Sequence, residues 1–294
     1  MLELFLTGFS WNMNGLGSGR IDELCRILEL HKYPYIVCLQ ESHSKNNNII
    51  NEWKQKLSIY NCYFNHGDGN NRGTGILLRK DFPFKILLEI QDWQEGRFSL
   101  IKGRILNQLI TIVSVYAPVD NKDKPYFFER ILSCNLEGMK IILGDYNAVP
   151  NPSLDRSRKT SPVKSLLDFI EFSDTIDSWR ELNPGLVSYT YGNTSRIDLC
   201  LISRIFKDTI KKASIGPHYF SDHSVIEFTL SLGESPYGQD FKKIRPATVA
   251  SNGFDKVFYT VWNRSLQYFR NILFDKLKNG NFIGDPTPVL ILLF

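Results

Sequence analysis

Six short segments of the chain place polar side chains where strand-like apolar runs end. In chain order these segments are SWNMNGL (10–16), CLQES (38–42), VSVYAP (113–118), LGDYNAV (143–149), SRIDLCL (195–201) and FSDHSV (220–225). A side chain at the end of a buried strand is held rigidly and still faces a cleft, which suits it to chemistry. A single Asp or Glu in such a place is more often a helix cap or turn former, so the joint order carries the signal.

The side chains in these segments match the needs of metal-assisted attack on a phosphodiester. Hard oxygen ligands and proton acceptors are the carboxylates of Glu41, Asp145, Asp198 and Asp222. Neutral groups for phosphate oxygens are those of Asn12, Asn147, Tyr116 and His223. The sequence therefore predicts an enzyme, a metal-dependent phosphodiesterase.

Two βαβ units are expected to position these residues. Apolar periodicity places a strand, a helix and a strand at 4–11, 21–30 and 35–39, and again at 109–116, 126–132 and 140–143. If the two units face each other across a sandwich, their strand ends meet at one edge and form a site between two sheets. The residues expected at that edge are Asn12, Glu41, Tyr116 and Asp145.

Between the two units, three runs separated by turn residues are predicted as consecutive antiparallel strands, at 72–78, 84–90 and 98–105. The glycine-rich GLGSG at 15–19 is interpreted as the opening of the first helix rather than as a phosphate-cradling loop.

The composition is that of an ordinary globular protein. The 294 residues are 43% hydrophobic and 22% charged, and a formal net charge of +4 permits a polyanionic partner without demonstrating one. Five cysteines form no CxxC pair, and their odd number fits a reducing compartment. The start of the chain carries no basic leader and no apolar run is long enough to cross a bilayer, so we expect an intracellular protein with no secretory signal and no membrane partner.

Composition shifts near residue 232, which predicts a domain at 1–232, a linker at 233–253 and a C-terminal part at 254–294. From 254 to 277, apolar residues recur every three or four positions, which predicts an amphipathic helix. This helix either packs against the first domain or begins a connection to a downstream domain. The apolar end VLILLF is interpreted as a truncation point.

Taken together, the six motifs are similar to those of the endonuclease/exonuclease/phosphatase superfamily. WNMNGL, LQES, VYAP, GDYN, RIDL and SDH occur in the family's order over roughly residues 4–232. The resemblance implies an α/β fold, a four-layer α/β/β/α sandwich in which two packed mixed β-sheets are flanked by helices.

Two further segments indicate one branch of this superfamily. NPSLDRS (151–157) and DSWRELNPGLVSYTY (177–191) resemble the apurinic-like endonuclease domain of LINE-type (non-LTR) retrotransposon proteins. Such domains nick one strand of double-stranded DNA, and the freed 3′ hydroxyl primes reverse transcription. The resemblance therefore implies a nuclear site of action and a downstream reverse transcriptase in a longer polyprotein.

The resemblance also implies the metal site. Glu41 is the principal Mg²⁺ ligand, for which Mn²⁺ is a substitute, and water with Asn14 or Asp222 completes the coordination. Repair enzymes of the superfamily commonly have Asp at the position of Asn14. The neutral side chain weakens the case for a second tightly held metal.

Catalytic roles follow from the same resemblance. Asp198 and His223 form a dyad in which the carboxylate fixes the imidazole tautomer. Asp145 polarises or deprotonates the attacking water and Asn147 orients it, while His223 stays open as the alternative proton acceptor. The groups that hydrogen-bond the phosphate are those of Tyr116 and Asn12.

Substrate choice is expected from surface loops. By resemblance, Thr190, Ser195 and Arg196 lie on a hairpin that reaches into a DNA groove, and Ser195 stands where repair enzymes carry a Trp. Arg156 and Arg158 are expected to contact backbone phosphates, with a solvated basic loop as the equal alternative.

Three functions stay open on the sequence. The first is the DNA-nicking retrotransposon endonuclease. The second is an apurinic/apyrimidinic repair endonuclease or exonuclease III-like enzyme, which needs a pocket for a baseless sugar. The third is an inactive nucleic-acid or protein docking remnant, against which the retention of every ionisable motif residue argues.

Overall fold

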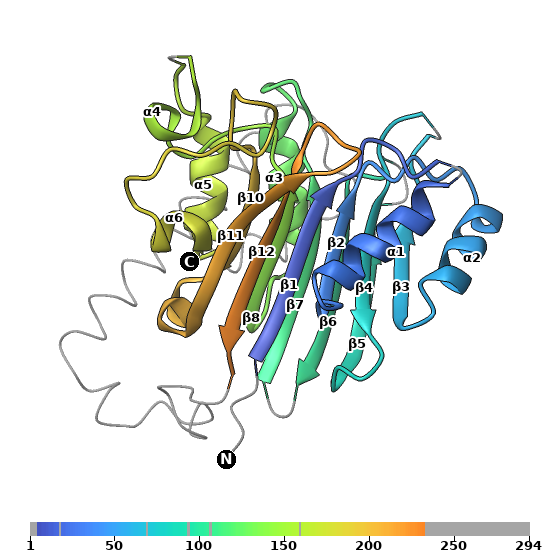
Figure 1. The fold of residues 1–294 in the computed structure, drawn as a ribbon. Helices are drawn as coiled ribbons and strands as arrows, with labels where there is room; N and C mark the ends of the chain where they lie inside the picture. The colour runs from blue at the N-terminus through green and yellow to red at the C-terminus, as the bar shows by residue number, and fades with distance from the viewer. Residues whose placement is uncertain are drawn as a thin grey trace, which may run out of the picture. The chain divides into compact units, whose positions relative to one another are not determined.

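Two six-stranded β-sheets pack face to face with helices on their outer faces, as Figure 1 shows. The computed structural model describes residues 5–232 except 18, 69, 93–94, 106–107 and 159. The predicted linker at 233–253 and the amphipathic segment and tail at 254–294 lie outside the described residues. The expected four-layer α/β/β/α arrangement is confirmed.

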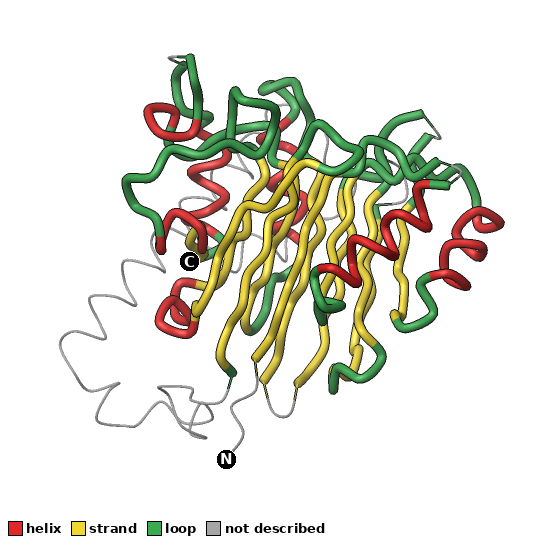
Figure 2. The backbone as a smooth tube through the Cα atoms, in the orientation of Figure 1, coloured by secondary structure: helices red, strands yellow, loops and turns green. Residues whose placement is uncertain are grey.

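The first sheet contains the first βαβ unit and has the strand order β11-β12-β1-β2-β4-β3. Its strands are β1 (Phe5–Asn12), β2 (Ile36–Gln40), β3 (Tyr60–Asn65), β4 (Thr74–Arg79), β11 (Ile210–His218) and β12 (Ser224–Ser231). β1 and β2 run parallel, and the other neighbours run antiparallel. The helices α1 (Arg20–Leu30) and α2 (Asn47–Lys56) cover its outer face, as can be followed in Figure 2.

The second sheet contains the second βαβ unit and has the order β5-β6-β7-β8-β10-β9. Its strands are β5 (Phe84–Gln91), β6 (Phe98–Ile105), β7 (Gln108–Tyr116), β8 (Met139–Asp145), β9 (Thr175–Asp177) and β10 (Asp198–Ser203). β7 and β8 run parallel, and the other neighbours run antiparallel. The helices α3 (Lys124–Ser133) and α5 (Lys164–Phe172) cover its outer face. Shorter turns of helix are α4 (Pro152–Asp155), α6 (Ser178–Leu182) and the 3-10 helix η1 (Arg204–Thr209).

Three hydrophobic layers hold these elements together, and strand alternation explains them. In β2, Ile36 and Cys38 belong to the core between the sheets, while Val37 and Leu39 pack under α1 and α2. Because both faces of such a strand are covered, its sequence is an unbroken apolar run rather than an alternating one. The same burial makes the strand ends rigid supports for polar side chains.

One strand prediction is wrong in its pairing. The run at 72–78 corresponds to β4, which pairs with β2 and β3 in the first sheet. Only β5 and β6 form the predicted antiparallel pair, in the second sheet. Apolar periodicity indicates that a strand exists but carries no information about which strand it pairs with. It therefore cannot predict where the chain crosses from one sheet to the other. The opening of the first helix by GLGSG is confirmed, because Gly19 caps α1 with φ +86°.

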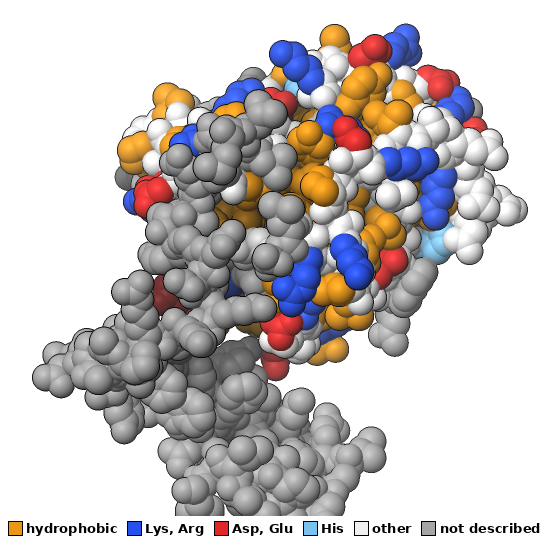
Figure 3. Space-filling model, turned by 90° about the horizontal axis from the view of Figure 1, so that it is seen from below, with side chains coloured by type: hydrophobic (Ala, Val, Ile, Leu, Met, Phe, Trp, Pro, Cys, Tyr) orange, Lys and Arg blue, Asp and Glu red, His pale blue; other side chains and the backbone are white. Residues whose placement is uncertain are grey.

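Strands of the two sheets lie opposite each other in pairs. β12 contacts β10, β1 contacts β8, β2 contacts β7, and β4 contacts β6. The paired strand ends therefore line one edge of the sandwich in a fixed order. Figure 3 looks from below at the opposite end, where the visible basic, acidic and hydrophobic side chains are mixed. Among the helices that the structure describes, none has the length and apolar character of a membrane span.

Candidate active site

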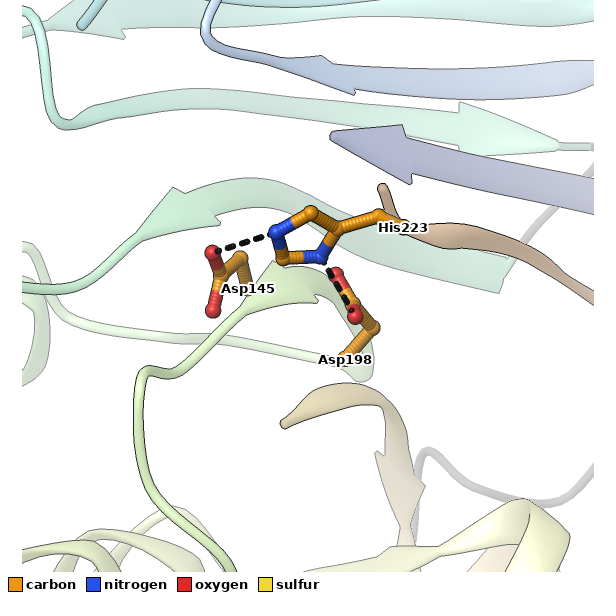
Figure 4. Close-up of side chains that lie close together, drawn as sticks. All are labelled: Asp145, Asp198 and His223. Atoms are coloured by element: carbon orange, nitrogen blue, oxygen red, sulfur yellow. Dashed lines mark hydrogen bonds and ion pairs between the residues drawn. The ribbon is translucent and has the colours of Figure 1, made fainter. Parts of the chain in front are cut away.

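An aspartate and a histidine face each other where β10 and β12 begin. Asp198 is the first residue of β10, and His223 directly precedes β12. Figure 4 shows the imidazole between two carboxylates: Nδ1 lies 2.9 Å from Oδ2 of Asp198, and Nε2 lies 3.9 Å from Oδ2 of Asp145. All three side chains are buried. Because Nδ1–H donates its hydrogen bond to Asp198, Nε2 is the nitrogen that faces the rest of the site.

The charges around His223 stabilise its protonated form. Burial by itself lowers the pKa of the imidazole, but the carboxylate of Asp198 and then that of Asp145 outweigh it and raise the pKa to about 9. The backbone of His223 is also fixed. Its carbonyl accepts from Trp11 Nε1 at 3.0 Å, and its N–H donates to Ser221 Oγ at 3.1 Å.

Asp145 ends β8 between two other site residues, because it pairs with Asp198 on β10 and with Tyr116 on β7. Its Oδ1 accepts from the backbone N–H of Asn147 at 2.8 Å, and its Oδ2 accepts from Asn12 Nδ2 at 3.0 Å. Burial, followed by the negative charge of Asp198, raises the pKa of Asp145 to about 7. A carboxyl group with a pKa near neutrality suits a general base.

Asn12 joins the two sheets at the centre of the site. Its Nδ2 donates to Glu41 Oε1 at 2.9 Å as well as to Asp145 on the opposite sheet. Its Oδ1 accepts from the backbone N–H of Asn14 at 3.1 Å, and its carbonyl accepts from Ser221 Oγ at 2.7 Å. The side chain is completely buried, so its amide is committed to the two carboxylates.

Glu41 and Tyr116 face each other at the ends of β2 and β7. Glu41 lies just past β2 with φ +51°, and its Oε2 accepts from His43 Nε2 at 3.1 Å. Burial, and then the charge of Glu41, raise the pKa of the Tyr116 hydroxyl, which keeps this group a proton donor. The sequence reasoning gave His43 no role. Its spacing, two residues past a strand-end carboxylate, is the signal that locates it.

The side-chain oxygens near Glu41 suit the coordination of a hard divalent cation. Asn14 Nδ2 donates to Asp222 Oδ1 at 3.3 Å, and both side chains are exposed at the mouth of the site. Asn14 is linked to Glu41 through Asn12. Carboxylate and amide oxygens that border water are the ligands preferred by Mg²⁺, which keeps several of its waters.

A second group of potential ligand atoms lies deeper. The carboxylates of Asp145 and Asp198 and the imidazole of His223 offer atoms within 4.8 Å of one another. The hydrogen bond between Asp198 and His223 already occupies one atom of each, which favours the dyad over direct metal coordination at this position.

The structure corrects the expected roles of two hairpin residues. Thr190 is completely buried, and its Oγ1 accepts from the backbone N–H of Asp198 at 3.0 Å. Arg196 is 1% exposed, and its Nε donates to Asp155 Oδ1 at 2.8 Å. Because these polar groups are engaged inside the protein, Thr190 and Arg196 support the dyad rather than present a surface to DNA. Ser195 is also buried, at 8% exposure.

The hairpin tip and the loop after α4 lie next to each other, and the hairpin contacts His223. The ring of Tyr191, 39% exposed, lies 4.9 Å from the imidazole between centroids. Arg156 forms a β-bridge with Ser195, which ties the loop to the hairpin. Arg156 is partly exposed and Arg158 fully so, and both stay candidates for phosphate contacts. The sequence reasoning missed Tyr191, although an aromatic residue next to Thr190 in SYTY marks it.

A comparison with curated proteins finds a transposon protein as a relative of this chain. Among curated proteins it is similar to the "Transposon TX1 uncharacterized 149 kDa protein" of Xenopus laevis, with 26% identity over 249 residues. The match covers 76% of this chain but 18% of that protein, so the chain spans about a fifth of its relative. This finding agrees with the resemblance to transposon-encoded endonuclease domains that the motifs indicate.

Solved structures share the fold. An AP endonuclease from Leishmania major superposes with a TM-score of 0.64 at 16% identity, covering 77% of this chain and 88% of that one. The APE2 catalytic domain of Xenopus laevis superposes with a TM-score of 0.62 at 21% identity, covering 85% and 98%. The Endonuclease/Exonuclease/phosphatase family model matches residues 9–223. Because this match spans most of the chain and includes all six motifs, the chain belongs to the endonuclease/exonuclease/phosphatase family.

Proposed function

We propose that this chain is a Mg²⁺-dependent DNA endonuclease that hydrolyses one phosphodiester bond of a duplex and leaves a 3′ hydroxyl and a 5′ phosphate. One observation carries the proposal: the amide of Asn12 bridges Glu41 and Asp145, and Asp145 lies against the Asp198–His223 pair. A metal ligand, a proton acceptor and a cationic imidazole thus stand in one row.

The charges around Asp145 and His223 support a division of roles between them. Asp145, with a pKa raised to about 7, accepts a proton from the attacking water. His223, with a pKa raised to about 9, is protonated at neutral pH and directs Nε2 toward the phosphate as negative charge builds. Asn147 has its Nδ2 anchored to the carbonyl of Ala117 at 2.9 Å, and its side-chain oxygen orients the water.

The remaining groups bind and stabilise the phosphate. When bound, Mg²⁺ neutralises charge on the phosphate oxygens, and Glu41 would hold it together with Asn14 or Asp222. Tyr116 donates a hydrogen bond from its hydroxyl. The oxygen of water bonds to phosphorus, the bond from phosphorus to the 3′ oxygen breaks, and this oxygen takes a proton from solvent. Mn²⁺ is expected to substitute because it accepts the same oxygen ligands.

The transposon relative supports a role in retrotransposition. We propose that the freed 3′ hydroxyl primes a reverse transcriptase encoded downstream in a longer polyprotein, which requires action on nuclear DNA. Arg156 and Arg158, in the loop after α4, are the proposed contacts to backbone phosphates.

A nicking assay tests the proposed function. The full chain is incubated with supercoiled plasmid and Mg²⁺, and open-circle product is measured. We expect nicking by wild type, and a loss of at least about 100-fold for Glu41→Ala and for His223→Ala. Matched controls on the surface, Glu29→Ala and His218→Ala, should nick at the wild-type rate.

The alternative functions predict other outcomes. Oligonucleotide duplexes that are intact and AT-rich are compared with duplexes that carry an abasic site. A strong preference for the abasic duplex would support a repair endonuclease instead. DNA binding by wild type without nicking in Mg²⁺ or Mn²⁺ would support an inactive docking remnant.

A further inference from the structure

Two arginines continue the row of site residues one strand pair further along the same edge of the sandwich. The facing pairs already described are His223 with Asp198, Asn12 with Asp145, and Glu41 with Tyr116, from β12/β10, β1/β8 and β2/β7. The next facing strands are β4 and β6, which begin at this same edge. Arg72 lies two residues before β4, and Arg97 lies directly before β6.

The backbone brings these two arginines together. The N–H of Gly73 donates to the carbonyl of Gly96 at 3.0 Å, so the residues that flank this bond are neighbours across the two sheets. Both glycines have positive φ, +88° and +64°, and a Cβ on Gly96 would meet a backbone oxygen at 2.1 Å. That oxygen is the carbonyl of His66, which leaves room only for a glycine at position 96. The N–H of Tyr116 donates to the carbonyl of Arg97 at 2.7 Å, which joins the pair to the established site.

The charge of Arg97 is incompletely balanced. The side chain of Arg97 is 14% exposed, and its Nη1 is buried without a hydrogen-bond partner among the described residues. Its Nε lies 3.4 Å from Glu95 Oε2, but Glu95 also pairs with Arg130 at 3.2 Å. Burial, and then the positive charge of Arg72, lower the pKa of Arg97. An unmet buried N–H beside a second cation calls for an anion.

We propose that Arg72 and Arg97 form a binding subsite for a backbone phosphate of the DNA, on the Glu41 side of the scissile bond and at the opposite end of the row from His223. This inference rests on the proposed function. Strands lie about 4.8 Å apart, so the pair is about 10 Å from Asn12 and Asp145, within about three nucleotides of the scissile phosphate. Planar guanidinium groups match phosphate oxygens in two-point contacts.

A binding measurement tests the subsite separately from catalysis. Fluorescence anisotropy of a labelled duplex is followed with the full chain in EDTA, at several salt concentrations. Arg72→Gln and Arg97→Gln should each weaken binding and reduce the slope of log K against log salt by about 1. The control Lys211→Gln removes an exposed lysine near the start of β11, at the end of the sandwich opposite the site, and should leave the slope unchanged.

A position scan separates a phosphate contact from a purely structural effect. Neutral methylphosphonate groups replace single phosphates within three nucleotides of the nick on either side. We expect one position that weakens wild-type binding but has no effect on Arg72→Gln. Equal losses at every position, or unchanged salt slopes in both arginine variants, would overturn the subsite.

The outcomes also distinguish the two proposals. Wild-type protein that binds and nicks DNA while Arg72→Gln behaves identically would remove the subsite and leave the endonuclease in place. Wild-type protein that neither binds nor nicks would remove the proposed function itself. If Arg97→Gln fails to fold, the partly exposed Arg72 carries the test.

Discussion

At the scale of single residues, the carboxylate of Asp198 raises the pKa of His223 through its charge and through a hydrogen bond of 2.9 Å. Replacing it by an amide removes the charge that opposes the effect of burial. We therefore predict that Asp198→Asn lowers the pKa of His223 by about 1 to 3. The measurement is an NMR titration of the imidazole in metal-free protein. Asp174→Asn, on an exposed turn, is the control, and an unchanged titration in Asp198→Asn would contradict the dyad.

At the scale of elements, Arg196 connects three segments that are far apart in the chain. Its guanidinium binds Asp155 at the end of α4 through Nε and Nη2, at 2.8 and 3.1 Å. Nη2 also lies 2.6 Å from Oδ2 of Asp177, the N-cap of α6. Two residues later the chain enters β10 with Asp198. The arginine thus fixes the segments on either side of the dyad carboxylate.

Removing this arginine should be costly, because the nearly buried carboxylate of Asp177 then has no cation and Asp155 keeps only Arg180. We predict that Arg196→Met destabilises the protein by about 3 to 5 kcal/mol in urea unfolding, and Arg196→Lys by less. The comparison is Arg204→Met. Arg204 is half exposed and pairs with Asp174 at 3.3 Å, so its loss should cost less than about 1 kcal/mol. Equal effects of the two methionine variants would exclude the connecting role of Arg196.

The same elements show what the sequence can and cannot reveal. Both βαβ units were predictable because their strands are covered on two faces and therefore read as apolar runs. Their ends carry the motif residues, so Asn12, Glu41, Tyr116 and Asp145 were expected together, and the structure brings them together. The partner of β4 was not predictable, since periodicity has no pairing information.

The burial of charged side chains was also not predictable from the sequence. An arginine in SRIDL suggests a surface cation for DNA, but its counter-charges stand 41 and 19 residues earlier in the chain. Only the folded arrangement of α4, α6 and β10 shows that Arg196 is enclosed. Arg72 and Arg97 escaped notice for a related reason, because their proximity depends on how two sheets stack.

At the scale of the whole molecule, the site occupies the junction of the two sheets and concentrates titratable groups there. The pKa of Asp145 is raised to about 7 from 3.8, and that of His223 to about 9 from 6.5. Each group binds more protons in the folded than in the unfolded state. Each therefore contributes stability that is lost as pH rises, from 3.8 to 7 for Asp145 and from 6.5 to 9 for His223.

We predict that the contribution of these two groups to the free energy of unfolding of the metal-free protein decreases as the pH rises from about 5 to about 8. His66, whose pKa is lowered by burial, acts in the opposite direction, and Lys124, lowered to about 8, acts mainly above this range. The decisive comparison is therefore with Asp145→Asn, because this variant lacks the first group and loses a charge that raises the pKa of His223. Urea unfolding at each pH should give a flatter profile for the variant, whatever constant offset the amide adds. Parallel profiles would mean that the junction of the sheets does not hold an ionisable cluster, and would withdraw the assignment of Asp145 as the base.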